Sequence, residues 1–345
     1  MFKGIKMDKI IAIHHHKDSF SENWIRYCKE NNLNYKLVNC YSTNIIETLQ
    51  NCSFLLWHWH HNDYKAQLFA RQFIKSIEYM NIKVFPNTHT GWHFDDKVGQ
   101  KYLFEAINAP FIKSYVFYNF EDTLKWIHTT SFPKVFKLRG GAGSSNVILL
   151  KTKAEAIKNA KMMFSTGYKH SRFKVLKEKW LQWKAIQNLN TAIGIVKGLI
   201  RIFFPSKIHT TLPTEKNYFY AQDFIPNNDC DIRVVIIGKK AFAIKRMVRK
   251  GDFRASGSGV IIYDRKEIPE ACIRSAFDVS KKLKLQSSAY DFVYLHDTPL
   301  LIELSYAFSQ NGYLDCPGYW DENLNWYAGK FCPESFIIED LLSEQ

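Results

Sequence analysis

The sequence lacks three features that would place it in familiar classes. It has no uninterrupted run of about 18 apolar residues, so we expect no membrane-spanning helix. Its N-terminus shows no long apolar segment followed by small residues, so we expect no signal peptide. The seven cysteines are scattered and form no C-x-x-C pair, which argues against a zinc site and a disulfide framework. Together these absences predict a cytoplasmic protein with reduced thiols.

Acidic residues are scarce relative to basic ones. The chain has 33 Asp and Glu against 47 Lys and Arg, a formal charge of +14. Half of this excess falls in residues 171–216, which hold nine basic and two acidic side chains. Such an imbalance predicts anionic ligands, such as a nucleotide, a phosphorylated sugar, an acidic lipid or nucleic acid.

Residues 189–204, inside this basic segment, are mostly apolar but carry Lys197 and Arg201 at helical spacing. Sixteen residues are too few to cross a bilayer. The segment either forms an insertion that covers a neighbouring part of the fold or lies on an anionic membrane surface as a peripheral contact.

The length of 345 residues and the 46% hydrophobic content predict two or three domains. In the first part, short apolar segments alternate with amphipathic ones, which is typical of a parallel sheet covered by helices. Strands are expected at Lys9–His14, Tyr35–Asn39, Ser53–Trp59 and Ile82–Phe85, and helices at Ser21–Glu30, Asn44–Gln50 and Tyr64–Met80. We predict an α/β domain at residues 1–90.

The pattern then changes to antiparallel strands with fewer helices, which predicts an α+β arrangement. We expect a central domain at 91–216 and a C-terminal domain at 217–345, whose tail after Gly312 reads as aromatic and irregular. Helices are expected at Asp96–Asn108, Ala154–Phe164 and Glu270–Leu283, and strands at Lys134–Leu138, Asn146–Leu150, Tyr218–Ile225, Asp231–Ile237, Ala241–Val248, Ala289–Leu295 and Leu300–Ser305.

The last two of these strands form a hairpin with two acidic residues inside apolar surroundings. If the turn centres on Asp297, then Asp291 lies directly opposite Glu303, with the two Cβ atoms about 5 Å apart. Two unscreened carboxylates at that distance repel by roughly 3 kcal/mol at an effective dielectric of 20. Either a cation lies between them, and carboxylates alone suit Mg²⁺, or each is paired with a basic residue. Ser305 shares the face of Glu303.

A glycine-rich segment, LRGGAGSSNV at 138–147, links two expected strands. Glycines let backbone N–H groups approach phosphate oxygens closely. The segment is not a P-loop, because no G-K-[ST] follows it and no helix begins there. It predicts either a flexible flap over a triphosphate, with Lys97 and Lys137 as neutralising charges, or an ordinary hairpin turn.

Basic residues gather on a second pair of strands. Asp231 and Arg233 share one face of the first, and Arg246 lies on the returning strand, with Arg254 further on. Guanidinium groups this close favour bidentate contact with phosphate or carboxylate and stabilise charge that develops during phosphoryl transfer. The alternative is a solvated basic face.

In this order, these segments resemble the ATP-grasp superfamily, the fold of glutathione synthetase, D-alanine–D-alanine ligase and the glutamate ligase of ribosomal proteins. The resemblance covers about residues 85 to 312 and implies an ATP-grasp fold with an N-terminal parallel α/β domain. It is carried by FDDKVGQKYLFEAINAP, FPKVFKLRGGAGSSNV, YFYAQDFI, DIRVVIIG with KRMV, FRASGSG, AYDFV and LIELS.

The resemblance implies the following roles. ATP is bound by Lys97, Lys137, Gly140, Gly141, Gly143, Gln222, Asp223, Phe224 and Ile225; phosphoryl transfer is served by Arg233, Arg246, Arg254 and Ser256; Mg²⁺ is held by Asp291, Glu303 and Ser305. Many members of the superfamily have asparagine where this chain has Ser305. A serine hydroxyl is a weaker ligand, which puts a second metal ion in doubt.

Two histidine clusters follow the first and third expected strands, where ligands of open parallel sheets gather. They comprise His14, His15 and His16, and His58, His60 and His61. We interpret His14, His15, His58 and His60 as substrate contacts, with structural histidines as the alternative; a zinc site has no supporting carboxylate or cysteine spacing.

The resemblance implies an ADP-forming ligase that activates a carboxylate as an acyl phosphate and joins it to an amine. A small acidic substrate, such as an acidic sugar or amino acid in surface-polysaccharide assembly, and an amine are the expected partners, with nucleic acid not expected. The alternatives are a peptide ligase that acts on a protein terminus and a nucleotide- or polyanion-binding protein without turnover. The sequence does not fix the oligomeric state.

Overall fold

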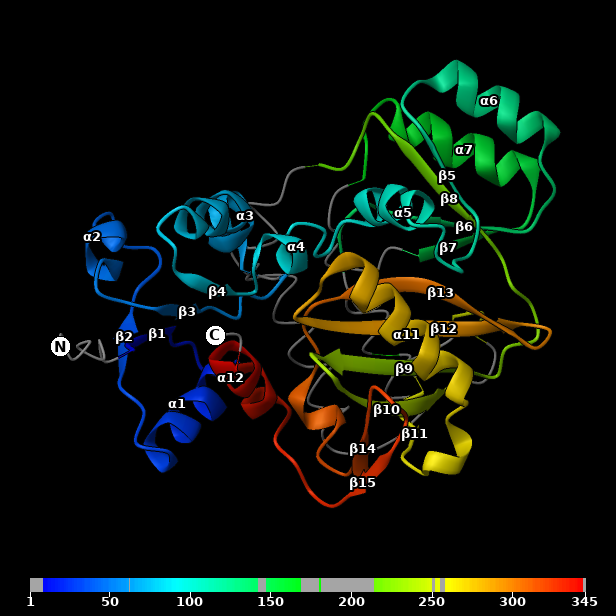
Figure 1. The fold of residues 1–345 in the computed structure, drawn as a ribbon. Coiled ribbons are helices and arrows are strands. Elements are labelled where there is room, and N and C mark those ends of the chain that lie inside the picture. Colours follow the sequence, from blue (N-terminus) through cyan, green and yellow to red (C-terminus); the bar gives the residue numbers. More distant parts are fainter. Residues whose placement is uncertain are drawn as a thin grey trace, which may run out of the picture.

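The computed structural model describes residues 9–61, 63–141, 147–168, 180, 214–249, 252–254 and 258–343. The predictions for Gly143 and Ser256, for the segment 189–204 and for most of the basic segment 171–216 lie outside these residues. In the described part the chain forms three sheets, each with its own helices (Figure 1).

The first sheet is parallel, as the alternating pattern predicted. Its order is β2-β1-β3-β4, and every pair is parallel. The strands are β1 Ile11–His14, β2 Tyr35–Val38, β3 Phe54–Leu56 and β4 Lys83–Phe85, and the helices are α1 Ser21–Glu30, α2 Ile45–Leu49 and α3 Tyr64–Glu78. Each element lies within its predicted range, and α1 matches it at both ends.

The second sheet is antiparallel, with the order β5-β8-β6-β7. Its elements are β5 Ser114–Phe117, α6 Phe120–Thr129, β6 Lys134–Lys137, β7 Val147–Leu150, α7 Lys153–Met163 and β8 Phe219–Asp223. The sequence analysis assigned neither β5 nor α6. It also began the C-terminal domain at residue 217, whereas β8 pairs with β5 and β6 and so belongs to the central unit.

The third sheet has seven strands in the order β13-β12-β9-β10-β14-β15, with β11 paired to β10. The strands are β9 Cys230–Ile237, β10 Lys240–Met247, β11 Ile261–Ile262, β12 Ser287–Leu295, β13 Thr298–Ser305, β14 Gly318–Asp321 and β15 Trp326–Ala328. The helices α4 Thr88–Gly91 and α5 Lys97–Ala106 precede it in the chain. Helix α11 Glu270–Leu283, the short 3₁₀ helices η1 Arg265–Glu267 and η2 Gln310–Gly312, and α12 Pro333–Ser343 accompany it.

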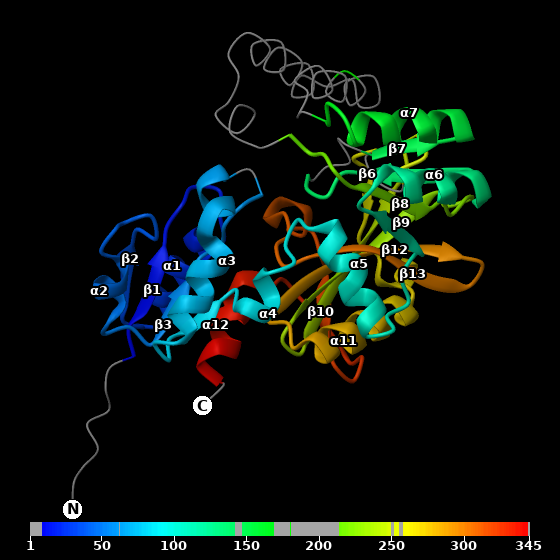
Figure 2. The same cartoon turned by 90° about the horizontal axis from the view of Figure 1, so that it is seen from above.

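The tail after Gly312 is regular, so its prediction as irregular was wrong. Strands β14 and β15 extend the third sheet from β10, and α12 packs against α1 and β9. The apolar residues Phe336, Ile337, Ile338 and Leu341 of α12 are buried. They are contiguous with the core of the first unit, and the views in Figures 1 and 2 both place α12 between α1 and the strands of the third sheet.

Three clusters of buried residues form the interior. One runs from the first sheet through α12 to one face of the third sheet, and a second fills the space between the other face and α11. The third belongs to the central unit alone and contains Ile127, Phe136 and Phe219. All seven cysteines are free thiols. None of the helices in the described ranges is both long and apolar enough to cross a membrane.

Candidate functional site

A cavity of about 680 Å³ opens where the three units meet. Residues predicted from distant parts of the sequence line it together: Lys97, Lys137, Gly141, Gln222, Asp223, Phe224, Ile225, Arg233, Arg246, Arg254, Asp291, Glu303, Ser305, His58 and His60. Among the described predicted residues, Gly140, His14 and His15 do not line it. The apolar part of its wall includes Ile112, Val135, Val293 and Ile302.

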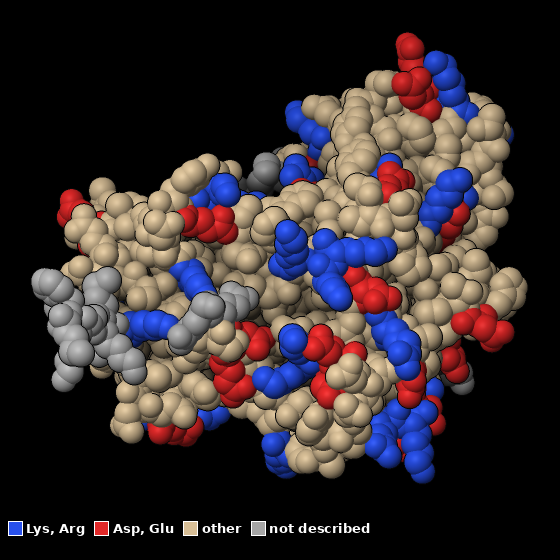
Figure 3. Space-filling model, viewed as in Figure 1, with Lys and Arg blue, Asp and Glu red and all other residues tan. Residues whose placement is uncertain are grey.

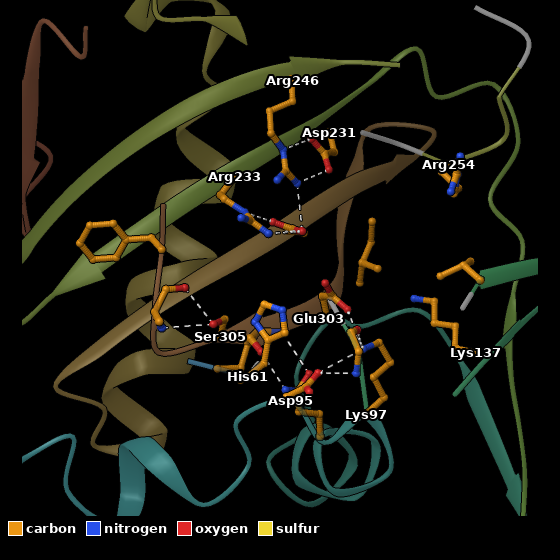
Figure 4. A pocket seen from close by; sticks show the side chains of 18 of the residues that line it. His61, Asp95, Lys97, Lys137, Asp231, Arg233, Arg246, Arg254, Glu303 and Ser305 are labelled. Carbon is orange, nitrogen blue, oxygen red and sulfur yellow. Dashed lines mark hydrogen bonds and ion pairs between the residues drawn. The ribbon is translucent and has the colours of Figure 1, made fainter. Parts of the chain in front are cut away.

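Two arginines and two aspartates that line this cavity form an ionic cluster, of which Figure 4 labels Arg233, Arg246 and Asp231. Because side chains two residues apart on a strand share a face, Asp231 and Arg233 of β9 point the same way. Asp231 is opposite Arg246 of β10, and Arg233 is opposite Asp291 of β12. Arg233 Nη2 lies 2.7 Å from Asp291 Oδ2, Arg246 Nη2 lies 2.9 Å from the same oxygen, and Arg246 Nε lies 2.7 Å from Asp231 Oδ1.

The two aspartates of this cluster titrate in opposite directions. Burial opposes ionisation of Asp291, but Arg233 and Arg246 outweigh it and hold its pKa well below the usual range. Burial and the neighbouring charge of Asp291 raise the pKa of Asp231 to about 6. Asp291 is therefore ionised at neutral pH and lies between two guanidinium groups.

Glu303 lies opposite Asp291, as predicted, but through an irregular hairpin. From the turn at residues 296–297, the strands pair Leu295 with Thr298 and Phe292 with Leu301. Continued without interruption, this register would bring Ile302 opposite Asp291. A β-bulge between Asp291 and Phe292 shifts the register by one residue, so that Glu303 takes that place. The bulge thus puts both carboxylates on the cavity face.

Lys97 links Glu303 to the glycine-rich segment. Its position is set by α5, whose first residue it is, and Asp96 caps this helix by accepting the Gly99 N–H at 2.9 Å. The Lys97 Nζ lies 3.6 Å from Glu303, 4.0 Å from Asp95 and 2.9 Å from the Gly141 carbonyl oxygen. Burial disfavours this ammonium group, yet Glu303 and Asp95 raise the pKa of Lys97 above its ordinary value.

Lys137 lies on β6, deep in the central unit. Its Nζ donates to Gln222 Oε1 at 2.7 Å, and Lys134, three residues earlier and so on the other face of the strand, pairs with Asp223 at 2.6 Å. Burial lowers the pKa of Lys137 to about 8, because desolvation and the charge of Lys97 outweigh the opposing effect of Glu303 and Asp291. Gln222 and Asp223 thus hold the lysines with their side chains, while Phe224 and Ile225 line the cavity beyond them.

Oxygen ligands of the kind that Mg²⁺ prefers meet at Asp291 and Glu303. In the structure their charges are balanced by Arg233, Arg246 and Lys97, which is the alternative that the sequence left open. The Ser305 hydroxyl is engaged locally, donating to Ala307 O at 2.8 Å and accepting from Ala307 N at 3.1 Å. The carboxylate pair fits a magnesium ion whose other ligands are phosphate and water oxygens. Metal binding by all three residues stays a prediction.

The two histidine clusters have different surroundings. His14 contacts the Tyr41 and Trp57 rings, and its Nδ1 lies 3.0 Å from the Cys40 amide nitrogen; His15 Nδ1 lies 2.9 Å from Ser21 Oγ. Both lie away from the cavity, which favours the structural alternative for them. His58, His60 and His61 line the cavity, and burial lowers the pKa of His61 to about 3.

The sequence analysis did not single out several residues that line the cavity. Asp95 accepts the Gly141 N–H at 2.8 Å and so positions the start of the glycine-rich segment. The sequence signal for Asp95 was its position directly before Asp96 and Lys97. Asp18, Glu22 and Gln310 also line the cavity, and nothing local in the sequence marks them, since only the fold brings residues 18–22 and 310 together.

Residues 157–312 match the model of the RimK-like ATP-grasp domain. No curated protein sequence matches the chain significantly. Among solved structures, the chain is similar to a RimK domain ATP-grasp protein from Sphaerobacter thermophilus, with TM-score 0.53, 12% identity and coverage of 96% of this chain and 98% of that one. It is also similar to D-alanine–D-alanine ligase from Bacillus anthracis, with TM-score 0.52, 13% identity and 87% coverage of both chains.

A third similar structure is the biotin carboxylase domain of 2-oxoglutarate carboxylase from Hydrogenobacter thermophilus, in complex with MgADP, ADP and bicarbonate. Its TM-score is 0.61 at 10% identity, and the match covers 99% of this chain and 71% of that one. At these identities the comparisons establish the fold.

Proposed function

Because the chain has the ATP-grasp fold and a RimK-like ATP-grasp match over residues 157–312, we propose that it is an ATP-dependent ligase that joins a carboxylate to an amine. The observation that carries this proposal is the cavity itself. It collects Lys97, Lys137, Arg233 and Arg246 around the opposed carboxylates of Asp291 and Glu303.

In the proposed reaction a carboxylate oxygen of the acid attacks the γ-phosphorus of ATP. The bond from that phosphorus to the β–γ bridging oxygen breaks, ADP leaves and an acyl phosphate forms. The amine nitrogen then attacks the acyl carbon and loses a proton as inorganic phosphate departs, which leaves an amide. Mg²⁺ would neutralise phosphate charge during the first step.

The chain's own residues serve this chemistry by position and charge. Lys97 and Lys137 lie at the end of the cavity toward the central unit and would neutralise phosphate oxygens. Phe224 and Ile225, at the end of β8, would hold the adenine with apolar neighbours such as Val135 and Ile302. Arg254, held by Asp252 at 2.6 Å, also lines the cavity and would contact the transferred phosphoryl group.

One observation supports each candidate for the substrate. The small acidic substrate, an acidic sugar or amino acid in surface-polysaccharide assembly, is supported by the chain's excess of basic residues. A peptide ligase that acts on a protein terminus is supported by the RimK-like match.

The test is to supply ATP and Mg²⁺ with a panel of uronates, amino acids and nucleotide sugars and to measure ADP and phosphate. We expect both products to appear in equal amounts only when the correct acid and amine are present. The variants Asp291→Asn and Glu303→Gln should lose turnover, since each removes a carboxylate from the predicted magnesium pair. Formation of AMP and pyrophosphate would contradict the acyl-phosphate route.

A polyanion-binding protein without turnover is the second candidate, favoured by the +14 charge. On the face shown in Figure 3, the basic side chains of the described residues have acidic ones beside them, and no patch of one sign covers that face. Such a protein would bind polyanions without ATP, with an affinity that falls steeply with salt. Asp291→Asn would leave that affinity unchanged.

A further inference from the structure

An arginine of the first unit binds the short turn that leads into α5. Figures 1 and 2 both place α4 between α3 and α5, and the chain passes from α4 to α5 through residues 92–96. From α3, Arg71 Nε donates to the Trp92 carbonyl oxygen at 2.8 Å, and its Nη2 donates to the Phe94 carbonyl oxygen. One planar guanidinium group therefore holds two carbonyl groups of this turn.

The contacts of Arg71 are all with neutral groups. Its third contact is with Gln67, whose Oε1 lies 3.4 Å from Nη1, and no carboxylate pairs with it among the residues that the structure describes. Burial lowers the pKa of this half-buried guanidinium, and the charges of Asp96 and Asp95 oppose that shift. The position of Arg71 is thus explained by its hydrogen bonds to the turn and not by an ion pair.

Capping of α4 explains only one of these two hydrogen bonds. Trp92 is the C-cap of α4, and a cation near a helix C-terminus commonly donates to the last carbonyl groups. Phe94 lies beyond this cap, inside the turn, so its hydrogen bond to Arg71 does not serve the helix. That second bond fixes the backbone directly before Asp95.

The turn needs such support because Asp95 has an unusual backbone conformation. Its φ of 54° lies in the left-handed region, which is uncommon for a residue with a Cβ and persists where the surroundings hold it. The Asp95 side chain lines the cavity, where Oδ1 accepts the Gly141 N–H at 2.8 Å and lies 4.0 Å from Lys97 Nζ (Figure 4). The turn that Arg71 holds therefore sets the positions of both Lys97 and the start of the glycine-rich segment.

We propose that Arg71 is a positioning residue for the triphosphate of ATP. It holds the turn at residues 92–96 so that Lys97 reaches the phosphates and Asp95 keeps the glycine-rich segment beside them. This inference deepens the proposed function, on which it rests. It gives the first unit a part in nucleotide binding, although no described lysine or arginine of that unit lines the cavity.

The test is calorimetric titration of the whole chain with the non-hydrolysable ATP analogue AMP-PNP and Mg²⁺. Arg71→Met keeps the apolar stem of the side chain and removes all its donors. The affinity for AMP-PNP should fall about tenfold or more, because even a small displacement of a positioned group is costly. Arg71→Lys can still donate to one of the two carbonyl groups, so it should bind only about threefold more weakly than the original chain.

Glu78→Ala is the matched control, because Glu78 joins the same helix to the other end of α4. Its carboxylate accepts the Thr88 N–H at 2.6 Å and the Thr88 hydroxyl at 2.7 Å, and neither residue lines the cavity. Denaturant unfolding should show a loss of stability for both Glu78→Ala and Arg71→Met. Only Arg71→Met should weaken the binding of AMP-PNP.

A double-mutant cycle shows whether Arg71 acts through Lys97. In a Lys97→Gln chain, the further change Arg71→Met should weaken AMP-PNP by less than about threefold, because the ammonium group that Arg71 positions is gone. An arginine with a merely structural role would cost the same factor in both backgrounds.

Hydrogen exchange tests the turn itself without nucleotide. The Lys97 N–H donates to Arg139 O at 3.0 Å and the Gly141 N–H to Asp95, so both amides should exchange at least about tenfold faster in Arg71→Met and not in Glu78→Ala.

Three results would overturn the role of Arg71: an unchanged affinity of Arg71→Met for AMP-PNP, an equal loss in Glu78→Ala, or unchanged exchange of both amides. The same loss factor with and without the Lys97 ammonium would likewise reduce Arg71 to a structural residue. Failure of the original chain to bind AMP-PNP with Mg²⁺ would instead count against the proposed function, and hydrogen exchange would still decide whether Arg71 holds the turn.

Discussion

The charge of Lys137 depends on pH in the range where enzymes are assayed. Its ammonium group donates to the neutral Gln222, and burial lowers its pKa to about 8. Lys97 differs, because Glu303 and Asp95 raise its pKa. If both lysines neutralise phosphate oxygens, then only Lys137 makes nucleotide binding sensitive to pH between about 7 and 9.

The expected sign follows from the protonation state. Below pH 8 Lys137 is mostly cationic and ready to bind a polyphosphate, whereas above pH 8 it must first take up a proton. Affinity for AMP-PNP should therefore fall about tenfold between pH 7 and 9, with proton uptake on binding at pH 9.

Calorimetry in two buffers of different ionisation enthalpy measures that uptake. Lys137→Arg should bind with an affinity that no longer varies in this range, because a guanidinium stays protonated. Lys97→Arg, the control, should keep the original pH dependence. The same dependence in Lys137→Arg would show that another group titrates.

At the scale of single elements, α5 determines where Lys97 lies. Asp96 accepts the Gly99 N–H as the N-cap and also pairs with Arg139 at 2.6 Å, so removal of its carboxylate frees the first turn of the helix. Asp96→Ala should destabilise the fold by about 1 kcal/mol. It should also weaken AMP-PNP binding, because Lys97 is the first residue of that turn.

A matched variant separates these two effects. Asn119 caps α6 in the same way, accepting the Asp122 N–H at 2.8 Å, but neither residue lines the cavity. Asn119→Ala should cost a similar amount in denaturant unfolding and leave nucleotide affinity unchanged. Equal affinities for the two variants would mean that the cap does not position Lys97.

The predictions from the sequence were strongest where an element follows its own periodicity. The first sheet, α11 and the opposition of Asp291 to Glu303 could be read from alternation and spacing. The bulge that brings Glu303 opposite Asp291 could not be read from the sequence, because a register shift depends on how β12 pairs with β9 as well as with β13. The partners Arg233 and Arg246 of Asp291 likewise depend on the order of strands in the sheet.

Two missed helices carried readable signals. Asn119 precedes Glu121 and Asp122, which is an N-cap followed by acidic residues in the first turn of α6. Pro333 and Glu334 begin α12, with apolar residues at helical spacing after them. The placement of α12 against α1 had no such signal, since more than 300 residues separate Trp24 from Glu334, whose carbonyl oxygen accepts the Trp24 Nε1–H at 3.1 Å.

At the scale of the whole molecule, the units differ in how firmly they are joined. The first unit, α12 and one face of the third sheet share a single buried cluster. Further contacts join them, with Gln286 accepting the Asn87 N–H at 2.7 Å and Tyr306 donating to Trp59 O at 2.6 Å. The central unit has a separate cluster. We therefore expect the first and third units to open together and the central unit to open by itself.

Two core substitutions of the same size test this expectation. Ile338 of α12 lies in the shared cluster and Ile127 of α6 in the central one, and both are almost fully buried. Each change to alanine should cost about 2–5 kcal/mol. In hydrogen exchange, Ile338→Ala should speed exchange in α12, α1, β1, β9 and β10 together, whereas Ile127→Ala should do so only in α6, β5, β6, β8 and α7. If Ile338→Ala affected α12 alone, the helix would be a peripheral attachment, and the first unit would be free to move against the cavity that its histidines line.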